Sequence, residues 1–221
     1  MRLPITIIFL LGFKLVMSTP ATAQGNFDLV KFSTTDGGMI EAALFPASSK
    51  KVVIFAHGAV FNKESWYFLC ELLQQSDISS LAIDFRGYGK SKAGSTGNKS
   101  QDILGAIDWL TESGFTNISI VGGSMGGAAV LGALSEVSTV VSKVVLLAPA
   151  GGPPVRAEKI DKLFIVSKGE GMYNGVVTIY KESTEPKLIR EFTGRAHAQH
   201  MFKEAYAPAL TKLILDFLHK D

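Results

Sequence analysis

The chain has 221 residues, with one cysteine and 22 Lys and Arg against 20 Asp and Glu. The formal net charge of +2 gives no basic footprint for nucleic acid, and a single cysteine excludes an internal disulfide framework and a multi-thiolate metal site. The length suits one domain with a full hydrophobic core.

The first 23 residues have the layout of a secretory signal peptide. A basic residue precedes the apolar run 3–17, which Lys14 interrupts, and small residues follow up to Ala23. Because this run is short and carries a charge, it disfavours the alternative of a retained membrane anchor. We expect cleavage after Ala23, which leaves a mature chain of residues 24–221 with zero formal charge and no stable membrane span. The protein would then be secreted or periplasmic.

Two apolar segments, 27–33 and 39–45, flank a turn at Asp36-Gly37-Gly38 and predict an antiparallel hairpin. From position 52 onward, short apolar runs alternate with longer segments of helical periodicity. The predicted strands of this part are 52–56, 80–84, 118–121, 143–148, 162–166 and 187–192. The predicted helices are 63–75, 100–111 with Ser100 as a candidate N-cap, 124–134, 175–183 and 205–219.

This alternation predicts an α/β fold. We expect a mostly parallel, twisted sheet of about eight strands, flanked by helices on both faces. No internal repeat or low-complexity linker divides residues 24–221, so they are expected to form one domain. The segment between the strands 143–148 and 162–166 is too short to hold a lid domain.

One segment, Gly122-Gly123-Ser124-Met125-Gly126-Gly127, lies where an apolar strand runs into a helix. It fits the pattern Gly-x-Ser-x-Gly of a nucleophile elbow, in which a serine occupies a strained strand-to-helix turn. Small residues tolerate such a turn, and the N–H of Met125 would lie at a helix N-terminus, where negative charge is favoured. The alternative is a glycine-rich helix start that packs closely on the sheet and has no chemical role.

Four stretches in this order make the chain resemble the α/β-hydrolase family. They are His57-Gly58-Ala59, the segment 84–91, the segment 122–127 and Gly194-Arg195-Ala196-His197. The resemblance covers essentially all of residues 24–221. Because no lid is expected, the chain is most similar to the small dienelactone-hydrolase-like and carboxylesterase members.

The resemblance implies that Ser124 is the nucleophile and that His197 is the base that activates it. His200 is the alternative base, and we favour a packing or capping role for it at the start of the last helix. His57 is expected to support the loop that follows its strand. Asp84 and Arg86 are expected to fix the neighbouring loop rather than contact substrate.

The acid of the triad is implied less directly. The family usually has an aspartate in the loop after the strand 162–166, at a spacing that falls on Glu170 in this chain. A glutamate can serve, because the order Ser, Asp or Glu, His admits either residue. The alternatives are that Glu170 is a solvated surface residue, that Asp161 takes its place, or that the site has no acid.

The resemblance also implies an oxyanion hole built from two backbone N–H groups. One would belong to Met125 and the other to Ala59 or its neighbour Val60. Donors aimed at the developing negative charge are worth about 10²–10³ each in rate.

These residues lead to the hypothesis of an exported serine hydrolase. We expect a carboxylesterase that cleaves small or short-acyl esters through an acyl-enzyme, with a small-molecule ester as its partner. No cofactor and no metal are expected, since the histidines lack the spacing of a metal site. The alternatives are a non-catalytic binding protein of the same fold, suggested by the missing aspartate, and a thioesterase or peptidase with the same triad.

Overall fold

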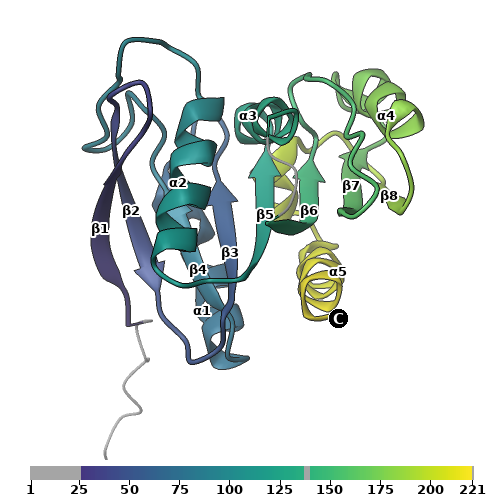
Figure 1. The fold of residues 1–221 in the computed structure, drawn as a ribbon. Helices are drawn as coiled ribbons and strands as arrows, with labels where there is room; N and C mark the ends of the chain where they lie inside the picture. Colours follow the sequence, from purple (N-terminus) through teal and green to yellow (C-terminus); the bar gives the residue numbers. More distant parts are fainter. Residues whose placement is uncertain (1–25, 137–139, 221) are drawn as a thin grey trace, which may run out of the picture.

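The computed structural model describes residues 26–136 and 140–220, and the predicted signal peptide lies outside this part (Figure 1). The strands are, in chain order, β1 (Asp28–Ser33), β2 (Met39–Phe45), β3 (Lys51–Ala56), β4 (Ser79–Ile83), β5 (Asn117–Gly123), β6 (Val141–Leu147), β7 (Asp161–Ser167) and β8 (Lys187–Phe192). The α-helices are α1 (Tyr67–Gln75), α2 (Ser100–Glu112), α3 (Met125–Leu134), α4 (Tyr173–Glu182) and α5 (Ala207–His219). Two 3₁₀ segments are η1 (Lys63–Trp66) and η2 (Ala198–Lys203).

The eight strands of the described part form one sheet in the order β1-β2-β4-β3-β5-β6-β7-β8. The six strands from β3 to β8 are parallel, whereas β2 pairs antiparallel with both β1 and β4. The predicted hairpin and the predicted mostly parallel sheet of about eight strands are therefore confirmed. The carboxyl ends of the parallel strands share one edge of the sheet, and the loops at that edge carry every residue singled out for chemistry.

Helices cover both faces of the sheet, as the apolar runs predict. In Figure 1, α2 lies in front of the sheet next to α3, and α5 passes behind β5 and β6. The helices α1 and α5 lie together on that far face and line a shared groove. The largest side chains that are fully buried in the core include Phe45, Phe55, Trp66, Phe85 and Phe164.

Several boundaries differ from those predicted. The helix predicted over 63–75 begins with the 3₁₀ turn η1, and the last helix begins at Ala207 because η2 precedes it. Ser100 is the first residue of α2 and not its cap, because Lys99 occupies the N-cap position, and the N–H of Ser100 donates to Oδ1 of Asn98 at 3.0 Å. The segment 148–160 contains no helix or strand, so no lid is inserted between β6 and β7.

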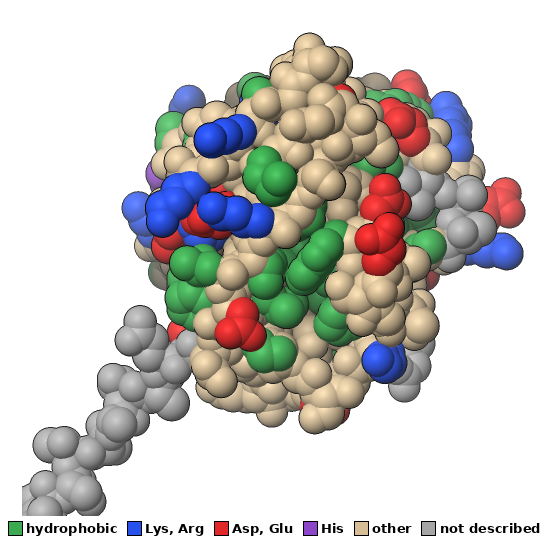
Figure 2. Space-filling model, turned by 60° about the vertical axis from the view of Figure 1, so that its left-hand side comes forward, with side chains coloured by type: hydrophobic (Ala, Val, Ile, Leu, Met, Phe, Trp, Pro, Cys, Tyr) green, Lys and Arg blue, Asp and Glu red, His purple; other side chains and the backbone are tan. Residues whose placement is uncertain are grey.

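The strand β1 forms one edge of the sheet. Figure 2 looks toward this side of the molecule and shows hydrophobic side chains gathered in the middle of the face, with acidic and basic side chains around them. Leu29 of β1 is 57% exposed and Met39 of β2 is 42% exposed. Within the described residues, no helix is long and apolar enough to cross a membrane.

Candidate active site

Ser124 occupies a sharp turn between β5 and α3. Its backbone angles are φ 50° and ψ −114°, and α3 begins at the next residue, Met125. A serine with a positive φ is strained, and such strain persists only where the surrounding structure imposes it. Two hydrogen bonds hold the turn, because Ser124 N–H donates to Leu147 O at 2.9 Å and Ala150 N–H donates to Ser124 O at 3.0 Å.

The glycines beside Ser124 provide space rather than unusual backbone angles, since their φ values are not positive. A Cβ at Gly126 would lie 2.3 Å from the carbonyl oxygen of Ala56 in β3. A Cβ at Gly122 would lie 2.9 Å from Cα of Gly127. The helix therefore packs directly against the strand ends, and this contact fixes the direction in which the serine side chain leaves the sheet.

The structure brings Ser124, His197 and Glu170 into one hydrogen-bonded chain. Nε2 of His197 lies 2.7 Å from Oγ of Ser124, and Nδ1 lies 2.7 Å from Oε2 of Glu170. From these partners we assign His197 to the neutral tautomer in which Nδ1–H donates to the carboxylate of Glu170 and Nε2 accepts from the hydroxyl of Ser124. The side chain of His197 is 33% exposed, so its ring can be reached from solvent.

Glu170 lies in the loop after β7, at the predicted position. Its side chain is only 2% exposed, and Oε2 also accepts the backbone N–H of Met172 at 3.3 Å. Within the described residues, Oε1 has no hydrogen-bond partner. The alternative of a solvated glutamate is excluded by this burial. Asp161 is the first residue of β7 and thus lies at the opposite end of the strand from Glu170.

His197 lies in the loop between β8 and η2. Oγ of Ser167 donates to the carbonyl oxygen of Ala196 at 2.6 Å and so ties this loop to the end of β7. His200 is exposed within η2, and its ring lies 5.0 Å from the ring of Phe61. Its predicted packing role fits this contact, although it lies before α5 and does not cap that helix.

The backbone near Ser124 carries unused donors. Within residues 26–136 and 140–220, the N–H groups of Met125, Ala59 and Val60 find no hydrogen-bond acceptor. Ala59 and Val60 are the central residues of a turn in which Phe61 N–H donates to Gly58 O at 3.1 Å. These donors suit an oxyanion, since a helix N-terminus and a turn both present N–H groups to negative charge.

His57 has a different environment from His197. It is fully buried, its Nδ1–H donates to Gly58 O at 2.8 Å, and its Nε2 accepts Phe85 N–H at 3.2 Å. Burial lowers the pKa of His57 below its ordinary value of 6.5. The ring also packs edge-on against Phe85 and Tyr88. His57 therefore supports the loop, as predicted.

Asp84 and Arg86 fix the loop after β4. Asp84 accepts the backbone N–H of Lys63 at 2.8 Å and its Nζ at 2.6 Å, which ties the start of η1 to the end of β4. Arg86 pairs with Asp102 at 2.7 Å and with Asp36 at 2.7 Å. The hydrogen bonds from Arg86 keep the pKa of Asp36 well below its usual range. These ion pairs stabilise loops and lie apart from the reacting groups.

Two residues of the site were missed by sequence reasoning. Gln199 is 4% exposed, and its Oε1 accepts Gly58 N–H at 2.8 Å. The hydroxyl of Tyr88 donates to Ala59 O at 3.0 Å. Tyr88 lies in the segment 84–91, but nothing there indicated a contact with Ala59, and the only sequence signal for Gln199 was that it follows His197 by two positions.

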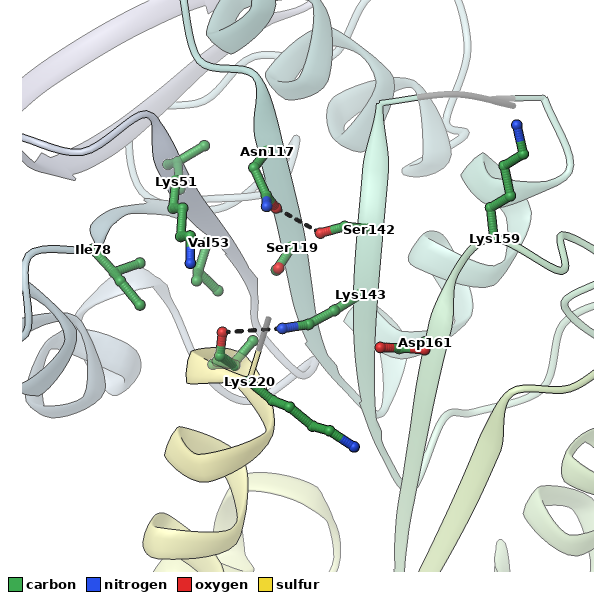
Figure 3. A pocket seen from close by; sticks show the side chains of 12 residues that line it. Lys51, Val53, Ile78, Asn117, Ser119, Ser142, Lys143, Lys159, Asp161 and Lys220 are labelled. Atoms are coloured by element: carbon green, nitrogen blue, oxygen red, sulfur yellow. Dashed lines mark hydrogen bonds between the residues drawn. The ribbon is translucent and has the colours of Figure 1, made fainter.

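A hollow lies at the amino ends of the parallel strands, at the opposite edge of the sheet from Ser124 (Figure 3). It encloses about 180 Å³ and is lined by Lys51, Asn117, Ser142, Lys143 and Asp161, among others. Nζ of Lys143 donates to the carbonyl oxygen of Leu218 at 3.4 Å, and Ser142 Oγ donates to Asn117 Oδ1 at 2.6 Å. Of the residues considered for the site, only Asp161, the alternative acid, lines this hollow. Among the described residues, no group of His, Cys, Asp and Glu could hold a metal ion.

Comparison with known proteins places these features in a family. The family model described as alpha/beta hydrolase fold matches residues 51–174, more than half of the chain. A Mycoplasma pneumoniae protein with the provisional name esterase/lipase 3 is 31% identical over 133 residues, which cover 55% of this chain and 46% of that protein. The chain spans less than half the length of the curated relatives it matches.

Solved structures share the fold. A dienelactone hydrolase from Anabaena variabilis is 23% identical with a TM-score of 0.70, and the match covers 88% of this chain and 97% of that one. An esterase from Pyrococcus furiosus is 18% identical with a TM-score of 0.72, and the match covers 91% and 92% of the two chains. At these identities the similarity establishes the fold alone. The activity has to be inferred from the geometry of the site.

Proposed function

The chain belongs to the α/β-hydrolase family, and we propose that it hydrolyses carboxylic esters through an acyl-enzyme formed on Ser124. The observation that carries this proposal is the chain of 2.7 Å contacts from Ser124 through His197 to the buried Glu170. A serine hydroxyl is a weak nucleophile by itself, and an adjacent base that a third group orients is the standard means of activating it. The names of its relatives, esterase and dienelactone hydrolase, support the same reaction class.

In the first half of the reaction, Oγ of Ser124 attacks the acyl carbon while Nε2 of His197 takes the hydroxyl proton. The carbonyl oxygen becomes an oxyanion that accepts hydrogen bonds from the N–H groups of Met125 and Ala59. The carbon–oxygen bond to the leaving alcohol then breaks, and His197 returns the proton to that oxygen. The negative charge of Glu170 stabilises the imidazolium while it carries this proton.

In the second half, water replaces the alcohol. His197 takes a proton from the water, and the resulting hydroxide attacks the acyl carbon of the ester on Ser124. The same N–H groups stabilise the second oxyanion. The bond to Oγ then breaks, the serine recovers its proton, and the carboxylic acid leaves.

The substrate is proposed to be a small or short-acyl ester. A shallow hollow of about 310 Å³ is lined by Met125, Ala128, Ala129 and the segment 97–100, and none of Ser124, His197 and Glu170 lines it. The absence of a helix or strand in residues 148–160 leaves the site without a lid that could enclose a long chain.

Export is a separate part of the proposal and depends on the sequence alone. The basic start, the short apolar run and the small residues before position 24 favour removal of residues 1–23. Expression in a bacterial host followed by N-terminal sequencing of the periplasmic protein would test it. We expect the mature chain to begin at Gln24, and a protein that stays in the cytoplasm at full length would contradict export.

The activity test is hydrolysis of p-nitrophenyl esters with acyl chains from C2 to C12, by the chain that begins at Gln24. We expect the wild type to prefer short chains and Ser124→Ala to lose at least about 10⁴-fold in kcat. Glu170→Gln should lose about 10²–10⁴-fold, because a neutral amide does not stabilise the imidazolium. His219→Ala, at the exposed end of α5, is the control and should retain full activity, since the ring of His219 is bound to Leu215 O of its own helix.

Three results would contradict the proposal. A wild type that neither cleaves any ester nor reacts with a fluorophosphonate probe would favour the binding-protein alternative. Faster turnover of thioesters or of p-nitroanilides than of the matched oxygen esters would favour the thioesterase or the peptidase. Activity that survives Ser124→Ala would place the nucleophile elsewhere.

A further inference from the structure

Gln199 is a buried polar side chain that the reaction scheme does not use. Its Oε1 accepts Gly58 N–H at 2.8 Å, and its Nε2 donates to Oγ of Ser65 at 2.7 Å. Both ends of the amide are therefore hydrogen-bonded, as a buried amide requires. The two partners belong to the segment between β3 and α1, whereas Gln199 follows the proposed base His197 by two residues.

The amide also fills the space between two strand ends. A Cβ at Gly58 would lie 3.0 Å from Oε1 of Gln199, and a Cβ at Gly123 would lie 2.8 Å from the same atom. Ala198, between His197 and Gln199, has a φ of 47° in the left-handed region that L residues seldom adopt. This backbone conformation brings His197 and Gln199 into contact with different segments, the first with Ser124 and the second with Gly58.

Gln199 binds one donor of the turn, the N–H of Gly58, and the N–H groups of Ala59 and Val60 have no acceptor in the described structure. Gly58 N–H is bound to Gln199, and Gly58 O accepts from Phe61 N–H and from the ring of His57. Since a trans peptide directs its C=O and N–H to opposite sides, fixing Gly58 O also fixes the direction of the N–H of Ala59. Tyr88 fixes the carbonyl of Ala59 in the same way.

We propose that Gln199 is a positioning residue that holds the oxyanion turn 58–61 in register with the His197 loop. This inference rests on the proposed ester hydrolysis. A single side chain then sets the distance between the group that removes the proton of Ser124 and the donors that stabilise the oxyanion. Its loss would leave His197 on Glu170 and Ser124 but would remove the bond that ties the turn to the His197 loop.

The test compares Gln199→Met, which keeps the length and bulk of the side chain, with Gln75→Met on the exposed end of α1 as the matched control. We expect Gln199→Met to lower kcat about 10²-fold, as for the loss of one oxyanion donor, with KM changed less than threefold. The midpoint of the pH profile should stay within 0.2 units (about the precision of such a measurement), because His197 keeps both of its partners. Ser65→Ala, which removes the second anchor of Gln199 together with a bond to Asn62 O but keeps the bond to Gly58, should give a smaller loss of kcat.

A readout that does not need turnover keeps this inference separate from the proposed function. In the wild type, the backbone amide of Gly58 should exchange slowly with solvent, and Gln199→Met should accelerate its exchange at least about tenfold while amides of α5 stay unchanged. If the wild type hydrolyses no ester, the proposed function fails while amide exchange still reports whether Gln199 holds the turn. Unchanged exchange at Gly58, a kcat within threefold of wild type, or a shifted pH midpoint in a folded Gln199→Met protein would each overturn the inference.

Discussion

The surroundings of His57 and His197 show how one residue type serves two purposes in the same fold. Both rings lie near the carboxyl edge of the sheet and both have two nitrogen contacts. The nitrogens of His57 are bound to backbone groups in the core, whereas those of His197 contact a hydroxyl and a carboxylate. A ring held by a fixed carbonyl acceptor and a fixed N–H donor is locked in one tautomer, so it stabilises a loop. A ring between Ser124 and Glu170 can accept a proton and remain paired.

The largest expected effect is on activity at His197. His197→Ala removes the base, and we expect kcat to fall about 10⁴–10⁶-fold, as for removal of a triad histidine elsewhere. The melting temperature should change by less than about 3 °C, because the ring is partly exposed and packs little. Ester hydrolysis and thermal unfolding of the same preparation would check both points. A variant that loses activity only because it unfolds would remove the contrast with His57.

The second effect is on stability at His57. His57→Ala leaves Phe85 N–H without its acceptor and opens a cavity between Phe85 and Tyr88. We expect the free energy of unfolding to fall by about 2–4 kcal/mol, the combined range for an unpaired buried donor and a lost buried ring. Urea unfolding would measure it, with His200→Ala as the control that should stay within about 0.5 kcal/mol. A loss below 1 kcal/mol would contradict a structural role for His57.

The smallest effect is the pH dependence of stability. Burial holds the pKa of His57 below 6.5, although Asp84 and Glu64 act in the opposite direction. Between the folded and unfolded pKa values the unfolded chain binds more protons at this residue, so its contribution to stability is lost as the pH falls below about 6.5. The slope of unfolding free energy against pH over this window should be shallower in His57→Gln than in the wild type. An equal slope in both proteins would mean that His57 titrates as freely as a surface histidine.

The arrangement of strands was largely predictable, because short, almost continuous apolar runs are typical of strands that are buried on both faces of a sheet. The segments 118–121 and 143–148 are apolar except at Ser119 and Lys143, so most of their side chains had to lie inside the sheet, and the bounds of β5 and β6 differ from them by at most two residues at each end. The start of α2 was predicted correctly at Ser100, but the cap was not, because Ser100 is the first helical residue and Lys99, which is no typical capping residue, precedes it at the N-cap position. The candidate residues Ser124, Glu170 and His197 came from the resemblance of four short stretches to the α/β-hydrolase family.

Contacts across the loops were not predictable in the same way. Gln199 and Gly58 are 141 positions apart, and no periodicity relates them. The pairing depends on the left-handed conformation of Ala198, and alanine carries no sequence signal for such a conformation. The same holds for the donor to Ala59 O, since a tyrosine four residues after a strand could point in several directions.

Cys70 in α1 has a practical consequence for any chemical study of this protein. It is the chain's single cysteine and is fully buried, and burial raises the pKa of its thiol well above the ordinary value. The thiolate is the reactive form, so this sulfur resists alkylation and oxidation while the chain is folded. We therefore expect that oxidants and reductants in the surrounding solution do not alter Cys70 in the folded chain. Electrophilic labels that react with both thiols and activated hydroxyls would report on Ser124 without a thiol background.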